Sequence, residues 1–233
     1  LFWVDGSSCI ISILIFALLV KEKKKIDISS HIKTVETAVV SVFKDKIFWI
    51  FLFVCFITSM LFFQLFTTLP IYHHEKYGLT EVQTGLLMTL NGLLIFFLEM
   101  PLVSILERKN TLKLQIILWG SIFMTLSLFI LLIDIWAGVL VISVVFMSFG
   151  EMFIFPFSNS FALSRAPIGH EGRYMALFTM SFSLAHIASS KVGMGIISVY
   201  GYEVNWLFMG ILGIVSIAGC LWVKKLSLEE NRL

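Results

Sequence analysis

Seven long apolar segments constrain this sequence more than any other feature. A helix needs about 20 residues to cross the hydrocarbon core of a bilayer, and each segment approaches or exceeds that length. Barrel strands would alternate in polarity, whereas a run such as IFWIFLFVCFI does not. The sequence therefore predicts an all-α integral membrane protein. The predicted spans are 1–20, 47–70, 84–105, 114–133, 137–161, 174–198 and 205–223.

Basic residues predict how these spans are oriented. If the first span ends in the cytoplasm, every Lys and Arg except Lys76 and Lys191 falls in a cytoplasmic segment. Such an excess of positive charge is typical of the cytoplasmic side. We therefore predict a multi-pass cell-membrane protein, in a bacterium the inner membrane, with a cytoplasmic C-terminus. The net charge of +2 is too small to indicate a nucleic-acid partner.

The connection 21–46 is the longest between the predicted spans and begins KEKKK. Apolar residues recur in it at helical spacing, as Ile32, Val35, Val39 and Val42. This pattern is typical of an amphipathic helix on the membrane surface. A solvated linker would explain the segment equally well.

A long basic loop followed by six spans resembles the second half of a major facilitator superfamily transporter. Residues 107–110, ERKN, resemble the acidic–basic motif between the second and third helices of each half, although this family prefers Gly where Val103 and Asn110 stand. Residues 150–187 resemble the tenth helix, cytoplasmic loop and eleventh helix of the drug–proton antiporter branch. The start LFWVDGSSCI resembles the sixth helix of that branch.

The resemblance implies a parent of twelve helices in two six-helix bundles, with substrate bound between them. Helices one to five would be missing, so the N-terminal half of the same transporter is an expected partner. The implied domains are the last helix of the N-terminal bundle, the inter-bundle loop, the C-terminal six-helix bundle and a cytoplasmic tail. Their bounds are 1–20, 21–46, 47–223 and 224–233.

Charges inside the spans are candidates for function, because each costs about 2.5–3.5 kcal/mol on insertion scales. Glu151 lies near the middle of the span 137–161. We predict that Ser148, Glu151, Ser158 and Asn159 share one helical face beside a polar cavity. A carboxylate there could carry the transported proton, or it could be a structural group bonded to a neighbouring helix.

Glu99 precedes Pro101 in the predicted span 84–105, and Asn91 lies eight residues earlier on roughly the same face. We assign Asn91 to the substrate and proton pathway. In the family this end of the helix gates the cytoplasmic side, which implies a gating role for Glu99, Glu107 and Arg108. A structural carboxyl paired with Arg108 is the alternative for Glu99.

Polar residues of the penultimate span complete the predicted pathway. Lys191 could snorkel to the interface, pair with Glu151 or bind an anionic substrate group. His186 could join a proton relay or donate a hydrogen bond between helices. In the second span, Gln64 heads a polar face that could line an outer vestibule.

The leading functional hypothesis is a secondary transporter that exports small amphipathic molecules or drugs against proton entry, surrounded by membrane lipid. A proton-coupled importer of sugars, peptides or other solutes is the alternative, followed by a seven-helix receptor. An enzyme is not expected, because no set of nucleophile, base or metal ligands converges. The sequence contains no zinc-ligand spacing, phosphate-binding loop or dinucleotide fingerprint, so neither metal nor cofactor is predicted.

Overall fold

The computed structural model describes residues 42–109, 112–133 and 136–230, together with Ser7, Ile10 and 13–15. The helical bundle lies in the second of two compact units, Ser41–Leu233. Apart from the few residues named here, the predicted span 1–20 lies outside the described residues. So does the predicted surface helix of the loop 21–46, except at its end.

Seven α-helices follow one another in the described part of the bundle, and it contains no strand. Six of them are long and apolar enough to cross a membrane, which confirms the all-α membrane fold. The seventh, α3, is short. The helices are α2 (Lys46–Thr67), α3 (Leu69–Tyr77), α4 (Glu81–Arg108), α5 (Lys113–Ile130), α6 (Gly138–Arg165), α7 (Glu171–Tyr200) and α8 (Tyr202–Glu230).

Local sequence signals account for several of the helix ends. Asp45 caps α2, since its side chain accepts a hydrogen bond from the backbone N–H of Phe48 at 3.0 Å. Thr80 and Gln83 form a reciprocal capping box at the start of α4, a motif that satisfies two otherwise unpaired backbone groups. Gly78 ends α3 at φ 63°, a left-handed conformation that glycine adopts without steric cost.

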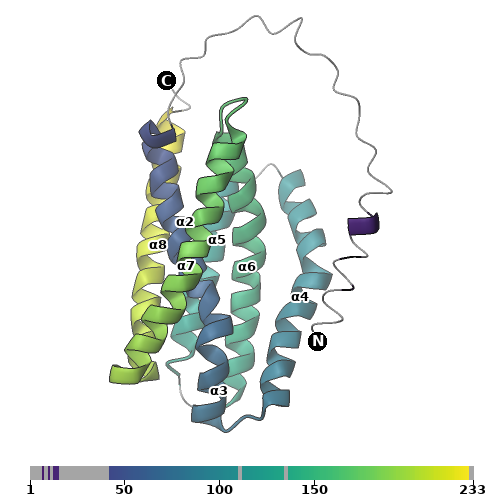
Figure 1. The fold of residues 1–233 in the computed structure, drawn as a ribbon, viewed down its shortest axis with the longest axis vertical. Helices are drawn as coiled ribbons and strands as arrows, with labels where there is room; N and C mark the ends of the chain where they lie inside the picture. Colours follow the sequence, from purple (N-terminus) through teal and green to yellow (C-terminus); the bar gives the residue numbers. More distant parts are fainter. Residues whose placement is uncertain are drawn as a thin grey trace, which may run out of the picture. The chain divides into compact units, whose positions relative to one another are not determined.

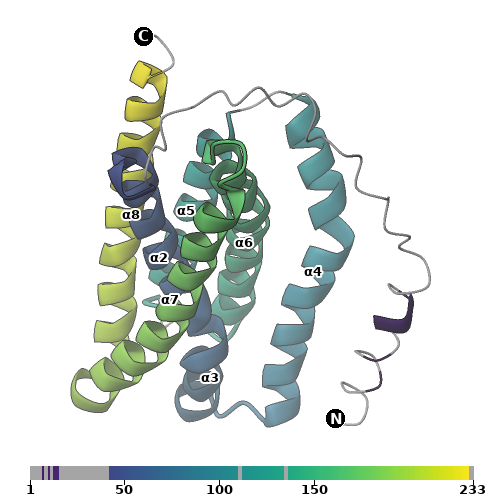
Figure 2. The same cartoon turned by 45° about the horizontal axis from the view of Figure 1, so that its top comes forward.

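Two apolar clusters form the core, one toward each end of the bundle. Near the end where α2 begins, the core contains Phe48, Phe51 and Phe161. Near the opposite end, where α3 lies, it contains Leu65 and Trp206. Both clusters draw on α2, α5, α6, α7 and α8, which pack together in Figures 1 and 2.

Helix α4 stands at the edge of this bundle beside α6 in both views (Figures 1 and 2). Its apolar side chains are mostly exposed, including Phe96 at 76% and Met100 at 80%. Asn91 is the one buried residue among the 28 that form α4. A polar side chain, rather than an apolar one, therefore occupies the best-covered position of this helix.

The predicted second span, 47–70, divides into α2 and α3. The helix breaks at Thr68, and Pro70 follows in the first turn of α3. Proline fits a first turn because its missing N–H would have no partner there in any helix. His73 on α3 is fully buried, and neither ring nitrogen has a hydrogen-bond partner among the described residues.

Acidification should weaken the packing of α3. Burial lowers the pKa of His73 to about 4, from 6.5. Between pH 6.5 and about pH 4, the His73 imidazole is protonated in the unfolded chain but not in the folded one. The free energy of unfolding therefore falls as the pH drops, by at most about 1.4 kcal/mol per pH unit. Thermal unfolding at pH 7 and pH 5 should therefore differ less in His73→Leu. His74→Leu, which removes an exposed imidazole, should keep the pH dependence and is the matched control.

Candidate functional site

A polar bridge between α4 and α6 forms the centre of the candidate site. The side-chain amide of Asn91 donates to the hydroxyl of Ser148 at 2.9 Å and to the carboxylate of Glu151 at 3.1 Å. Glu151 is the fourteenth of the 28 residues of α6 and is half-buried. The bridge thus lies near the middle of a helix long enough to cross the membrane.

A second carboxylate lies on the same helix as Asn91. Glu99 follows eight residues later on α4 and is half-exposed. Glu107 and Arg108 are exposed at the end of α4, and neither takes part in an ion pair among residues 42–109, 112–133 and 136–230. The pairing of Glu99 with Arg108, which was the alternative to a gating role, is therefore absent from the described region.

The residues of the predicted polar face of α6 differ in burial. Ser148 and Ser158 are fully buried, whereas Asn159 is exposed. At about 100° per residue these residues still fall within one sector of the helix, but that sector is covered at Ser158 and open at Asn159. Only Ser148 and Glu151 meet a polar partner on α4.

The polar residues of α7 lie apart from this bridge. His186 is exposed, and its ring stacks on Phe63 of α2 with 4.4 Å between ring centroids. Lys191 is exposed and forms no ion pair in the described part of the chain. Glu151 accepts a hydrogen bond from Asn91, and a Lys191–Glu151 pair, one of the alternatives for Lys191, is not among the ion pairs of the described residues.

Gln64 belongs to a buried cluster that joins α2, α7 and α8. Its amide donates to the hydroxyl of Ser189 at 2.8 Å, and its carbonyl accepts from Thr68 at 2.5 Å and from Asn205 at 3.2 Å. Gln64 is fully buried. Its side chain therefore bonds three helices together in this conformation rather than lining an open vestibule.

The sequence of residues 1–190 matches the family model of the Major Facilitator Superfamily. This match covers most of the chain. The chain belongs to the Major Facilitator Superfamily. This superfamily consists of membrane transporters, so membership agrees with the expectation that the chain is not an enzyme.

Two curated relatives are similar in sequence to the chain. The chain is 29% identical over 164 residues to the uncharacterized MFS-type transporter YttB of Bacillus subtilis (strain 168). It is 18% identical over 196 residues to a Na(+), Li(+), K(+)/H(+) antiporter of Planococcus maritimus. The alignments cover 70% and 78% of this chain but 41% and 46% of the relatives. The chain thus spans less than half the length of each of these relatives.

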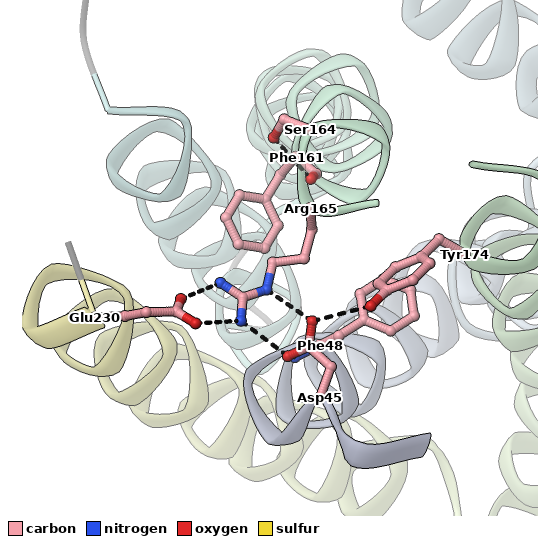
Figure 3. A network of polar contacts seen from close by, with 7 residues as sticks. All are labelled: Asp45, Phe48, Phe161, Ser164, Arg165, Tyr174 and Glu230. Atoms are coloured by element: carbon pink, nitrogen blue, oxygen red, sulfur yellow. Dashed lines mark hydrogen bonds and ion pairs between the residues drawn. The ribbon is translucent and has the colours of Figure 1, made fainter. Parts of the chain in front are cut away.

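An ionic network at the N-terminal end of α2 is a further polar feature of this superfamily member (Figure 3). The guanidinium of Arg165 donates to both carboxylate oxygens of Asp45, at 2.8 and 3.0 Å, and to the carboxylate of Glu230. The hydroxyl of Tyr174 also donates to Asp45, at 3.3 Å. The network joins α6, the Asp45 cap of α2, α7 and α8.

Sequence reasoning did not predict this network. An aspartate directly before an apolar span is a recognisable helix cap, and that signal identifies Asp45. Arg165 lies 120 residues from Asp45 and 65 from Glu230, so no spacing in the sequence pairs them. Only the packing of the helices brings their ends together.

Proposed function

We propose that the protein is a secondary active transporter that couples the efflux of small amphipathic molecules to proton entry. This proposal rests on one observation. Glu151, at the middle of α6, bonds to Asn91, the single buried residue among those of α4. Ionisable groups at such a depth are expensive and are usually functional.

The chemistry of the bridge supports a link between protonation and helix position. An ionised carboxylate only accepts hydrogen bonds, so it holds the donating amide of Asn91. A protonated Glu151 carries an O–H that donates, and its attraction for Asn91 weakens because charge-assisted hydrogen bonds are about twice as strong as neutral ones. Proton uptake would therefore loosen α4 from α6, which is the kind of change that alternating access requires.

Other parts of the chain receive roles that follow from this proposal. Residues 47–223 would form the C-terminal bundle, 224–233 the cytoplasmic tail, 21–46 the inter-bundle loop and 1–20 the last helix of a partner N-terminal bundle. The Arg165 end would face the cytoplasm of a bacterial cell. Glu99, Glu107 and Arg108 would gate that side, while Asn91, Asn159, Gln64, His186 and Lys191 would serve the pathway.

A second candidate is exchange of a monovalent cation for protons. Glu99 and Glu151 are carboxylates on the packed helices α4 and α6, and the hydroxyl of Ser148 accepts from the same Asn91 amide as Glu151. Carboxylate, amide and hydroxyl oxygens are the ligands that hard cations prefer. The relative from Planococcus maritimus is named as an antiporter of Na(+), Li(+) and K(+), which favours this candidate over a solute importer.

The test uses inverted membrane vesicles that contain the complete carrier and hold an acidic interior. Addition of a transported molecule should release protons and collapse the pH gradient, measured with a fluorescent pH probe. The molecules added are 2-naphthoate, 2-naphthamide, tetraphenylphosphonium and sodium chloride. For Glu151→Gln, every response should fall to that of vesicles lacking the protein, because the variant has no carboxylate to protonate.

Glu203→Gln is the matched control, since the Glu203 side chain is 80% exposed at the start of α8; it should respond like the unmodified protein. Glu151→Asp, which keeps a carboxylate, should retain part of the response. An unchanged response in Glu151→Gln, at equal protein in the membrane, would contradict proton coupling through Glu151. A response to sodium chloride alone would favour cation exchange over efflux of amphipathic molecules.

A further inference from the structure

A shallow groove of about 640 Å³ runs along α7, away from the bridge at Glu151. It is lined by His186, Ile187, Ser190, Lys191 and Met194. His186 is the sixteenth of the 30 residues of α7, so the groove begins at the middle of the helix. Lys191 follows five residues later, about 7.5 Å along the helix axis.

No carboxylate among the described residues neutralises this groove. The only acidic residue of α7 is Glu171, in its first turn, 20 residues before Lys191. Among the described residues of α2, α6 and α8, the helices packed against α7, Glu151 is the one carboxylate that lies between helix ends, and Asn91 binds it. The ammonium group of Lys191 therefore remains available for an anion.

The rest of the groove suits a ligand with a charged head and an apolar body. The hydroxyl of Ser190 and the ring N–H of His186 can donate hydrogen bonds. Stacking on Phe63 holds the imidazole ring in place. Ile187 and the flexible thioether of Met194 offer apolar contacts that adapt to different shapes.

We infer that this groove binds the anionic head of a transported molecule, an amphipathic organic anion such as an aromatic carboxylate. The inference rests on the proposed function and narrows its substrate class. The competing explanation is that Lys191 extends toward the lipid headgroups, as long basic side chains do. In that case the charge would contribute nothing to ligand binding.

Isothermal titration calorimetry on the purified full chain in detergent separates these explanations. The probes are 2-naphthoate, its neutral isostere 2-naphthamide, and inorganic phosphate as a headgroup surrogate without an apolar body. We expect 2-naphthoate to bind more tightly than either. Lys191→Gln should weaken its binding about tenfold, the loss of one charge-assisted contact, and Lys191→Arg should retain most of the affinity.

Lys225→Gln is the control, because Lys225 is an exposed lysine near the end of α8; it should bind 2-naphthoate normally. Equal affinity in Lys191→Gln and the control, with equal unfolding temperatures, would overturn the inference in favour of the lipid-facing lysine. Equal affinity for 2-naphthoate and 2-naphthamide would overturn it as well. Either result would leave the vesicle response at Glu151 intact, so a failure of this inference differs from a failure of the proposed function.

Discussion

Replacement of Arg165 by alanine should lower the free energy of unfolding by about 3 kcal/mol, because removal of one partner of a buried ion pair leaves the other charge uncompensated. The Asp45 side chain is 8% exposed, and Arg165 donates to both of its oxygens. Asp45 also caps α2. The substitution therefore weakens the contact between four helix ends at once (Figure 3).

Reversible unfolding in mixed detergent micelles, followed by tryptophan fluorescence, measures this effect. Arg173→Ala is the matched control, since Arg173 is exposed near the start of α7 and should change stability by no more than about 0.5 kcal/mol. Arg165→Lys keeps the charge but loses the planar fork that binds two carboxylates, so it should fall between the two. Equal stabilities of Arg165→Ala and Arg173→Ala would show that the network adds nothing.

The substitution Gly120→Leu should lower the free energy of unfolding by about 2–3 kcal/mol, because it overpacks the close contact between α5 and α6. A β-carbon at Gly120 would lie 2.9 Å from the β-carbon of Phe153 and 3.0 Å from the carbonyl oxygen of Gly150. Neither neighbour is the free end of a side chain. The two helix backbones would have to separate.

Gly195→Leu on α7 is the control for this substitution, because a β-carbon at Gly195 would meet nothing within 4 Å. Its stability should stay within about 0.5 kcal/mol of the unmodified protein. The same unfolding assay compares the two variants. If Gly120→Leu unfolds like Gly195→Leu, the close approach of α5 and α6 does not contribute to stability.

The transmembrane helices were predictable from the sequence because hydrocarbon thickness imposes a length that apolar runs reveal directly. The predicted spans beginning at residue 47 and beyond each correspond to a helix. Their ends differ by several residues, since helices extend past the hydrocarbon: α8 continues to Glu230, beyond the predicted end at 223. The separation of α3 from α2 was missed, although Pro70 marks it.

Individual side chains were harder to place. Glu151 and Asn91 were singled out because they are polar within apolar runs, and they do contact each other. The same reasoning could not predict that Gln64 would be buried among three helices, because helical spacing gives a direction around one helix but not the identity of the neighbour. Contacts between distant helices depend on packing, which the sequence of one helix does not specify.

The position of α4 has a consequence for motion within a bilayer. In water, separating α4 from α6 would expose apolar surface and be opposed by the hydrophobic effect. In lipid, acyl chains cover that surface almost as well as protein does, so the apolar contacts of α4 resist displacement only weakly. The two hydrogen bonds that Asn91 donates to Ser148 and Glu151 then take a larger share in holding α4 against α6 than they would in water.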